Sequence, residues 1–143
     1  MHAEQISIFL ENKAGRLSEV TQILSEAGVN IRALALADTS DFGVLRLIVD
    51  DNAKAAHALK TQGFTVKNTP VVAALVSDRP GGLHGILDLL TKAGINVEYM
   101  YAFVAQSGNN AVMIFRFDKI DEAIDLLSKN NVEIIDGNTL YTM

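Results

Sequence analysis

An internal repeat is the feature that most constrains this chain, because two similar halves fold most simply as two copies of one small unit. Residues 11–31 read ENKAGRLSEVTQILSEAGVNI, and residues 77–97 read SDRPGGLHGILDLLTKAGINV. Most of the shared residues are types that set backbone shape or fill a core, so the repeat indicates a duplicated fold before a duplicated site. The identical pairs are Gly15/Gly81, Leu17/Leu83, Leu24/Leu90, Ala27/Ala93, Gly28/Gly94 and Asn30/Asn96.

The repeat continues beyond these two stretches. After a loop that is longer in the second half, residues 44–66 lie over residues 112–134. Almost no linker separates the halves, since Pro70 stands between the last strand expected in the first half and the first strand expected in the second. The sequence therefore predicts two domains, residues 1–69 and residues 70–143.

The first half has the pattern of a βαββαβ unit. Its first helix carries one apolar stripe, formed by Leu17, Val20, Leu24 and Ala27, and Gly28 suits the left-handed position that ends a helix. Alternating or β-branched segments predict the strands, and an alanine-rich segment predicts the second helix. The expected strands are 5–10, 30–38, 44–50 and 64–69, with a turn at 39–43 and the second helix at 52–62.

The second half repeats this order. The expected strands are 71–77, 95–104, 111–117 and 132–141, the helices are 82–93 and 121–130, and QSGNN forms a hairpin. Asp121 is expected to cap the second of these helices. A single unit of this size is only marginally stable by itself, so the two units should pack together. We expect them side by side, as one antiparallel sheet with helices on one face. The fold class is therefore α+β.

Composition limits the function classes. The chain has 143 residues, 49% of them hydrophobic, which suffices for a packed core. It has no cysteine, so disulfides and thiolate chemistry are excluded. The net charge of −5 argues against nucleic acid as the main partner. No apolar run long enough to span a membrane and no signal-peptide layout is present, so a soluble cytoplasmic protein with no membrane partner is expected.

Catalytic and cofactor motifs do not occur in the sequence. His2, His57 and His84 have no metal-ligand spacing, and no serine lies in a G-x-S-x-G elbow. The RPGGLHG stretch at 79–85 matches neither dinucleotide-binding nor Walker patterns. We therefore expect no enzyme, metal or cofactor. His84 stands in the first turn of a helix, where it either donates to a ligand or is simply solvated.

A strand, a polar turn with glycine and a helix start occur twice, and this arrangement suits a small ligand. Helix N-termini attract carboxylates, and Gly15 and Gly81 let a ligand approach the backbone closely. Asn12 and Asp78 stand in the turns, and Asn30 and Asn96 open the second strand of each half. Amide and carboxylate oxygens accept from an ammonium group, so the set suits a free α-amino acid. Glycine for a turn and asparagine at a helix exit are also ordinary scaffold residues, and this second interpretation stays open.

The motif E-N-[KR]-x-G-x-L, followed by a helix and A-G-V-N-I, resembles the ACT domain, a small regulatory module of amino-acid metabolism. The resemblance covers both halves, so the chain looks like a tandem ACT protein without an enzyme domain. It implies two ferredoxin-like units paired into an eight-stranded sheet, with amino-acid ligands at the interface between the units. It further implies that one site joins the 11–17 turn to Asn96 and the other joins the 77–83 turn to Asn30.

Two departures from the family pattern make the two implied sites unequal. Ala14 replaces the usual proline, which Pro80 keeps, and Asp78 replaces the asparagine that Asn12 keeps. Tyr99, Met100 and Tyr101 could line a pocket or belong to the core or a dimer contact. The resemblance and the residue pattern together predict the ligand-binding residues as Asn12, Lys13, Ala14, Gly15, Arg16, Leu17, Asn30, Ile31, Asp78, Arg79, Pro80, Gly81, Gly82, Leu83, His84, Asn96 and Val97.

The predicted function is that of a stand-alone regulatory protein that binds a free amino acid and forms a homodimer, with a regulated enzyme as a further partner. The alternative is a ligand-free module for dimerisation or protein interaction, because some ACT modules bind nothing.

Overall fold

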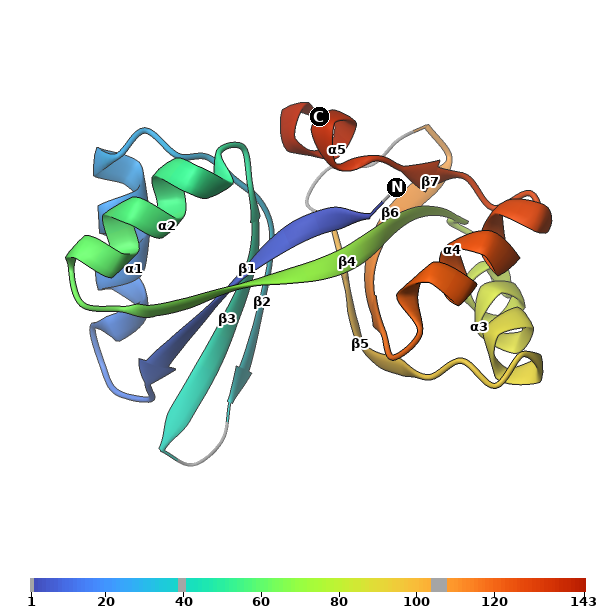
Figure 1. The fold of residues 1–143 in the computed structure, drawn as a ribbon, viewed down its shortest axis with the longest axis horizontal. Coiled ribbons are helices and arrows are strands. Elements are labelled where there is room, and N and C mark those ends of the chain that lie inside the picture. Colours follow the sequence, from blue (N-terminus) through green and yellow to red (C-terminus); the bar gives the residue numbers. More distant parts are fainter. Residues whose placement is uncertain (1, 39–40, 104–107) are drawn as a thin grey trace. The chain divides into compact units, whose positions relative to one another are not determined.

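A computed structural model describes residues 2–38, 41–103 and 108–143 of the chain, and these residues form two compact units (Figure 1). The N-terminal unit is Glu4–Thr69. The C-terminal unit is Pro70–Met143, to which Ala3 also belongs. Parts of the expected turn at 39–43 and of the QSGNN hairpin lie outside the described residues.

The N-terminal unit has the expected βαββαβ order. Its sheet has the strand order β2-β3-β1-β4, in which the first and third strands are neighbours, as in the split βαβ unit. The β1–β3 and β2–β3 pairs are both antiparallel. Its elements are β1 (Ala3–Glu11), α1 (Arg16–Glu26), β2 (Ile31–Asp38), β3 (Phe42–Val49), α2 (Asn52–Thr61) and the first part of β4 (Thr65–Ser77).

One face of this sheet and the inner sides of α1 and α2 enclose the core of the N-terminal unit (Figure 1). Alternate residues of β1 and β3 point into it, and Val20 and Leu24 meet them from α1 as the predicted stripe requires. Leu17, which was expected in the same stripe, is 41% exposed. Side chains on a helix lean toward its N-terminus, so a residue of the first turn extends past the helix end rather than over the sheet.

The C-terminal unit repeats this architecture. Its strands take the order β7-β4-β6-β5, and α3 and α4 cover one face (Figure 1). The core includes Phe115 and Phe117, two residues apart on β6, whose rings stack with centroids 5.5 Å apart. The predicted α+β class with two βαββαβ units is confirmed. Its elements are the second part of β4, α3 (Gly82–Lys92), β5 (Val97–Ala102), β6 (Asn110–Phe117), α4 (Ile120–Lys129), β7 (Ile134–Ile135) and α5 (Gly137–Thr142).

Strand β4 is continuous through Pro70, whereas the sequence predicts two strands separated by this proline. The fixed φ of proline is compatible with extended backbone, and proline lacks only the N–H donor. The carbonyl oxygen of Pro70 accepts a hydrogen bond from Nη1 of Arg116 on β6 at 3.1 Å. The side-by-side, eight-stranded arrangement of the two units remains a prediction.

The C-terminal segment corrects a second expectation. The predicted strand 132–141 is only the short β7, and α5 follows it. Asp136 is the reason, because its side chain accepts a hydrogen bond from the backbone N–H of Thr139 at 2.9 Å and thereby starts a helix. Leu140 on α5 is fully buried.

The start of α4 also differs from expectation. Asp121 is not the capping residue, because the helix begins at Ile120 and the cap position belongs to Lys119, which makes no side-chain cap bond. Asp121 stands in the first turn, where a carboxylate still interacts favourably with the helix dipole. Across the residues that the structure describes, no helix is long and apolar enough to cross a membrane.

Candidate functional site

The two glycine turns precede α1 and α3 in the same way. Gly15 and Gly81 both occupy the left-handed region, with φ of 91° and 85°, at the cap position of their helices. Within the described residues, neither helix has a side-chain cap bond at this end. The first backbone N–H groups of both helices are therefore not capped by a side chain, as a carboxylate-binding helix start requires.

Each turn is tied to the hairpin of its own unit. The backbone N–H of Asn12 donates to the carbonyl oxygen of Asp41 at 2.9 Å, and the N–H of Asp78 donates to the carbonyl of Asn109 at 3.1 Å. Asn12 and Asp78 thus hold equivalent positions in the two units, as the repeat predicts. All residues of the two turns from Asn12 to Gly15 and from Asp78 to Gly81 are exposed.

The two predicted asparagines are anchored by aspartates that the sequence analysis did not include. The N–H of Asn30 donates to Oδ1 of Asp50 at 2.9 Å, and the N–H of Asn96 donates to Oδ1 of Asp118 at 3.0 Å. Both aspartates occupy the same position of the repeat, where residues 44–66 lie over residues 112–134. An aspartate at the same position in both halves is the sequence feature that could have indicated Asp50 and Asp118.

Within one unit, the structure does not bring the turn and the asparagine together. Asn12 precedes α1 and Asn30 follows it, and the helix has 11 residues. At 1.5 Å per residue, such a helix is about 16 Å long. The same holds for Asp78 and Asn96 on either side of α3, which also has 11 residues.

The remaining predicted residues differ in exposure. His84 is exposed in the first turn of α3, and Leu17 is exposed on α1. The residues that follow the two asparagines, Ile31 and Val97, are half-buried, as are Arg16, Gly82 and Leu83. Of the tyrosine segment, Tyr101 is buried, Tyr99 is half-buried and Met100 is exposed.

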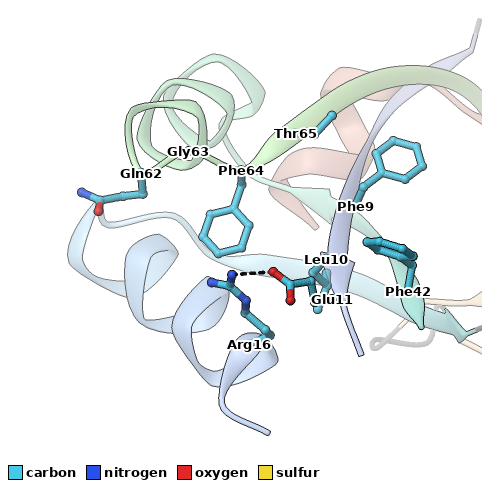
Figure 2. A pocket seen from close by; sticks show the side chains of 9 residues that line it. All are labelled: Phe9, Leu10, Glu11, Arg16, Phe42, Gln62, Gly63, Phe64 and Thr65. Atoms are coloured by element: carbon cyan, nitrogen blue, oxygen red, sulfur yellow. Dashed lines mark hydrogen bonds and ion pairs between the residues drawn. The ribbon is translucent and has the colours of Figure 1, made fainter. Parts of the chain in front are cut away.

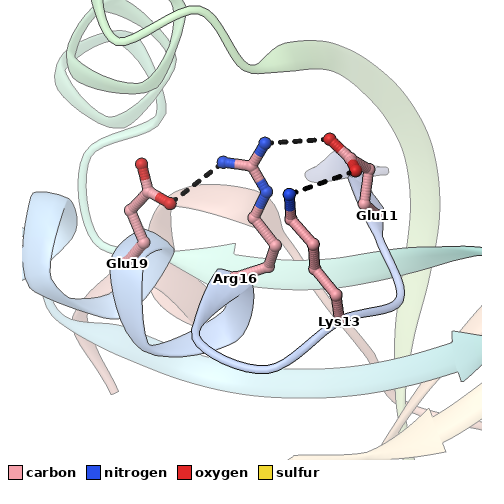
Figure 3. Close-up of polar contacts among 4 residues, drawn as sticks. All are labelled: Glu11, Lys13, Arg16 and Glu19. Atoms are coloured by element: carbon pink, nitrogen blue, oxygen red, sulfur yellow. Dashed lines mark hydrogen bonds and ion pairs between the residues drawn. The ribbon is translucent and has the colours of Figure 1, made fainter.

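Four charged side chains form a cluster beside the first turn (Figure 3). The guanidinium of Arg16 donates to Glu11 at 2.9 Å and to Glu19 at 3.0 Å, and the ammonium of Lys13 lies 3.4 Å from the other oxygen of Glu11. The hydrogen bond from Arg16, followed by that from Lys13, holds the pKa of Glu11 below its ordinary value. The same bond from Arg16 to Glu11 raises the pKa of Arg16.

A cavity of about 300 Å³ opens next to this cluster, inside the N-terminal unit (Figure 2). Arg16 lies at one side of it, with its guanidinium carbon 5.8 Å from the centroid of the Phe64 ring. Arg16 is the one residue that the predicted site shares with this cavity. The lining residues are Phe9, Leu10, Glu11, Arg16, Phe42, Gln62, Gly63, Phe64 and Thr65.

The sequence analysis missed the aromatic residues of this cavity. Phe9, Phe42 and Phe64 come from β1, β3 and the segment between α2 and β4. They are three of the six phenylalanines in the chain, and none of them belongs to the 11–31 motif. The sequence held one sign of these residues, because they differ between the two halves of the repeat. The equivalent positions of the second half are Leu75, Asn110 and Val132.

Two βαββαβ units in one chain, each with a glycine turn before its first helix, define a tandem of two small α+β modules of the same fold. A family model described as an ACT domain pair matches residues 1–143. The chain belongs to this family, and the resemblance to ACT domains is confirmed. An ACT domain pair is a regulatory rather than a catalytic module.

Solved structures agree with this assignment. Protein BT0572 from Bacteroides thetaiotaomicron is 41% identical, with a TM-score of 0.93 over 100% of this chain and 98% of that chain. The ligand-free regulatory subunit of aspartate kinase from Thermus thermophilus is 17% identical, with a TM-score of 0.62 over 91% of this chain and 93% of that chain. At this identity, the second similarity shows the fold alone. None of the curated proteins matches the chain.

Proposed function

We propose that this chain is a regulatory protein that binds a free amino acid through its two glycine turns and its two anchored asparagines, and that it has no catalytic step of its own. The observation that carries this proposal is the duplication of the polar anchoring, in which Asp50 holds Asn30 and Asp118 holds Asn96 in the same way. The local scaffold fixes the backbone at the points where the resemblance to ACT domains implies ligand contacts.

The chemistry of these residues fits both charged groups of an amino acid. The start of α1 or α3 offers backbone N–H groups and the positive end of the helix dipole to a carboxylate. The side chains of Asn30 and Asn96 are exposed, and an amide oxygen accepts from an ammonium group. Asp78 adds a negative charge that its counterpart Asn12 lacks, so the two sites should bind with different affinity.

A complete site needs residues from two units. The turn and the asparagine of one unit lie at opposite ends of a helix of about 16 Å, which exceeds the span of a free amino acid. In the proposal, therefore, the turn of one ACT unit and the asparagine of another contact the same ligand, as the family resemblance implies. Ligand binding would then stabilise one arrangement of the units and change the surface that a regulated enzyme contacts.

A module that only dimerises is the second candidate, and one observation favours it. Leu34 and Leu36 on β2 are 49% and 53% exposed, and β2 is the end strand in the order of the N-terminal sheet. Apolar side chains on an end strand suit pairing with another copy of the chain. This candidate requires no amino acid.

Isothermal titration calorimetry with each of the twenty amino acids separates the two candidates. Under the proposal, one or two amino acids bind, and Asn12→Ala and Asn96→Ala each remove binding at the site to which they contribute. Asn68→Ala is the matched control, because Asn68 is an exposed asparagine on β4 outside both turns and should leave binding unchanged. If none of the twenty amino acids binds, the proposal is refuted. A dimer that forms with increasing protein concentration would then support the second candidate.

A further inference from the structure

We infer that the groove between α1 and α2 is a docking site for a basic amphipathic helix of a partner protein. The groove belongs to the N-terminal unit, has a volume of about 450 Å³ and is lined by residues of both helices (Figure 1). None of its lining residues belongs to the turns or the asparagines of the proposed function, so the inference goes beyond that function. The lining includes Glu19, Gln22, Ile23 and Glu26 of α1, Ala27 at its end, and Ala58 of α2.

The floor of the groove is apolar, and its rims are polar. Ile23 and Ala27 are half-buried and pack against the core of the N-terminal unit, and Ala58 is half-buried on α2. The polar lining residues of both helices are exposed. Small side chains on the floor leave room for the side chains of a third helix. An amphipathic helix that lays its apolar face into the groove removes this floor from water.

The charge of the groove is negative. Among the described residues that line it, Glu19 and Glu26 are acidic, and none is a lysine or an arginine. The carboxylate of Glu26 accepts a hydrogen bond from Nε2 of Gln22 at 3.1 Å, and this donor is uncharged. The carboxylate of Glu19 accepts from Nη1 of Arg16 at 3.0 Å. A cation from a partner therefore has two acceptors, and Glu26 attracts it more because its donor carries no charge.

The spacing of the two glutamates suits a helical partner. Glu26 follows Glu19 by seven residues on α1, which corresponds to about 10 Å along the helix axis. Two lysines or arginines with the same spacing on a helix that runs alongside α1 can meet both carboxylates. Their apolar stems then lie over the groove floor while their charged ends reach the rim.

The equivalent groove of the C-terminal unit has the opposite chemistry. Lys92 occupies the position that corresponds to Glu26, so the sign of the charge is reversed. Nζ of Lys92 lies 2.9 Å from Oδ2 of Asp88, and Nζ of Lys129 lies 2.8 Å from Oδ2 of Asp125. The helices of the C-terminal unit balance these charges internally. The docking site therefore belongs to the N-terminal unit.

Fluorescence anisotropy of the full chain with a labelled peptide tests the inference. The probe is an alanine-based helical peptide of about 20 residues, with two lysines at the spacing of Glu19 and Glu26 and a leucine between them on the same face. We expect a dissociation constant below about 1 mM at low salt, and binding about fivefold weaker in about 0.5 M NaCl. A peptide with glutamates in place of the lysines, and one with the lysines on opposite faces, should each bind at least about tenfold more weakly.

Variants of Glu26 test the charge of the groove. Glu26→Lys introduces the charge that the C-terminal unit has at this position, and it should lower the affinity for the lysine peptide at least about tenfold. Glu26→Gln should lower it about threefold, because an attraction is lost and no repulsion is added. Glu122→Gln is the matched control, since Glu122 is exposed in the first turn of α4 and does not line the groove. It removes the same charge from the chain and should leave the affinity unchanged.

Ala58→Leu tests the floor without a change of charge. A leucine here fills space that the partner helix needs, so the affinity should fall at least about fivefold. The same fold has Leu126 at the equivalent position of the C-terminal unit. Ala53→Leu is the matched control, because Ala53 is exposed on the same helix and does not line the groove. Circular dichroism should show that all variants fold.

Four results would overturn the inference. The first is no binding of the lysine peptide at about 1 mM, and the second is equal binding of the peptide with lysines on opposite faces. The third is full binding by both Glu26→Lys and Ala58→Leu. The fourth is a loss of self-association in Glu26→Lys, measured by sedimentation, because it would assign the groove to a second copy of the chain.

Asn96→Ala keeps this inference separate from the proposed function. This variant alters a predicted amino-acid site and no residue of the groove, so the lysine peptide should bind it with unchanged affinity. If the peptide binds and no amino acid does, the docking site stands and the proposed function fails. If an amino acid binds and the peptide does not, the docking site fails and the proposed function stands.

Discussion

The carboxylate of Asp118 accepts a hydrogen bond from the backbone N–H of Asn96 at 3.0 Å, and the N–H of Asp118 donates back to the carbonyl of Asn96 at 3.2 Å. Asp50 and Asn30 make the same two contacts in the N-terminal unit, at 2.9 and 3.1 Å. In both units this reciprocal pair links the start of the second strand to the end of the third.

Asp118→Ala should lower the free energy of unfolding by about 1 kcal/mol, because the N–H of Asn96 loses its partner. Asp118→Asn is the matched control, because its amide oxygen can still accept the hydrogen bond from the N–H of Asn96. The free energy of unfolding should therefore fall by less in this variant. Urea unfolding followed by circular dichroism measures both. Equal destabilisation by the two variants would show that the contact with the N–H of Asn96 is not what Asp118 contributes.

Gly82→Ala should destabilise the C-terminal unit by about 2 kcal/mol or more, because overpacking forces backbone to move. A Cβ on Gly82 would lie 2.0 Å from the carbonyl oxygen of Ser77, a backbone atom that cannot turn away. Gly85→Ala on the same helix is the control. Nothing lies within 4 Å of a Cβ at Gly85, and replacing a helical glycine by alanine should stabilise by about 0.5–1 kcal/mol.

Thermal unfolding of the two glycine variants gives this comparison directly. The expected result is a lower melting temperature for Gly82→Ala and an equal or higher one for Gly85→Ala. A Gly82→Ala protein as stable as the unmodified chain would mean that the turn before α3 can open without cost.

Glu11→Gln should remove part of the pH dependence of stability. The pKa of Glu11 is lowered in the folded state by its bonds to Arg16 and Lys13, so folding is favoured above the pKa of the unfolded carboxyl group. This stabilisation is lost as the pH falls through the folded-state pKa. The group is exposed, so we expect a small effect that weakens as salt is added.

Melting temperatures of the unmodified chain and of Glu11→Gln between about pH 7 and about pH 3 test this sign, because the carboxyl group titrates in that window. The unmodified chain should be the more stable at neutral pH, and the difference should shrink toward acid pH. A difference that stays constant with pH would show that Glu11 acts through packing rather than through its charge.

Much of the fold is predictable because it depends on local signals. The stripe of Val20 and Leu24 on α1, the glycine that ends this helix, and the alternation along the strands are all set by neighbours in sequence. Some local features were misjudged, among them the cap of α4, which is at Lys119 rather than Asp121. Pro70 was taken as a break, although extended backbone accepts proline, and Asp136 was not considered as a helix cap.

The candidate site also has a part that the sequence predicts and a part that it does not. The positions of Gly15, Gly81, Asn30 and Asn96 follow from the sequence alone, because each marks the start or end of one helix. That Asp50 anchors Asn30, and that Glu11, Arg16 and Phe64 meet beside one cavity, was decided by the tertiary structure. Asp50 is distant from Asn30 in sequence, and Phe64 is distant from Glu11 and Arg16, so only the packing of α1, α2 and the sheet in one unit brings these residues together.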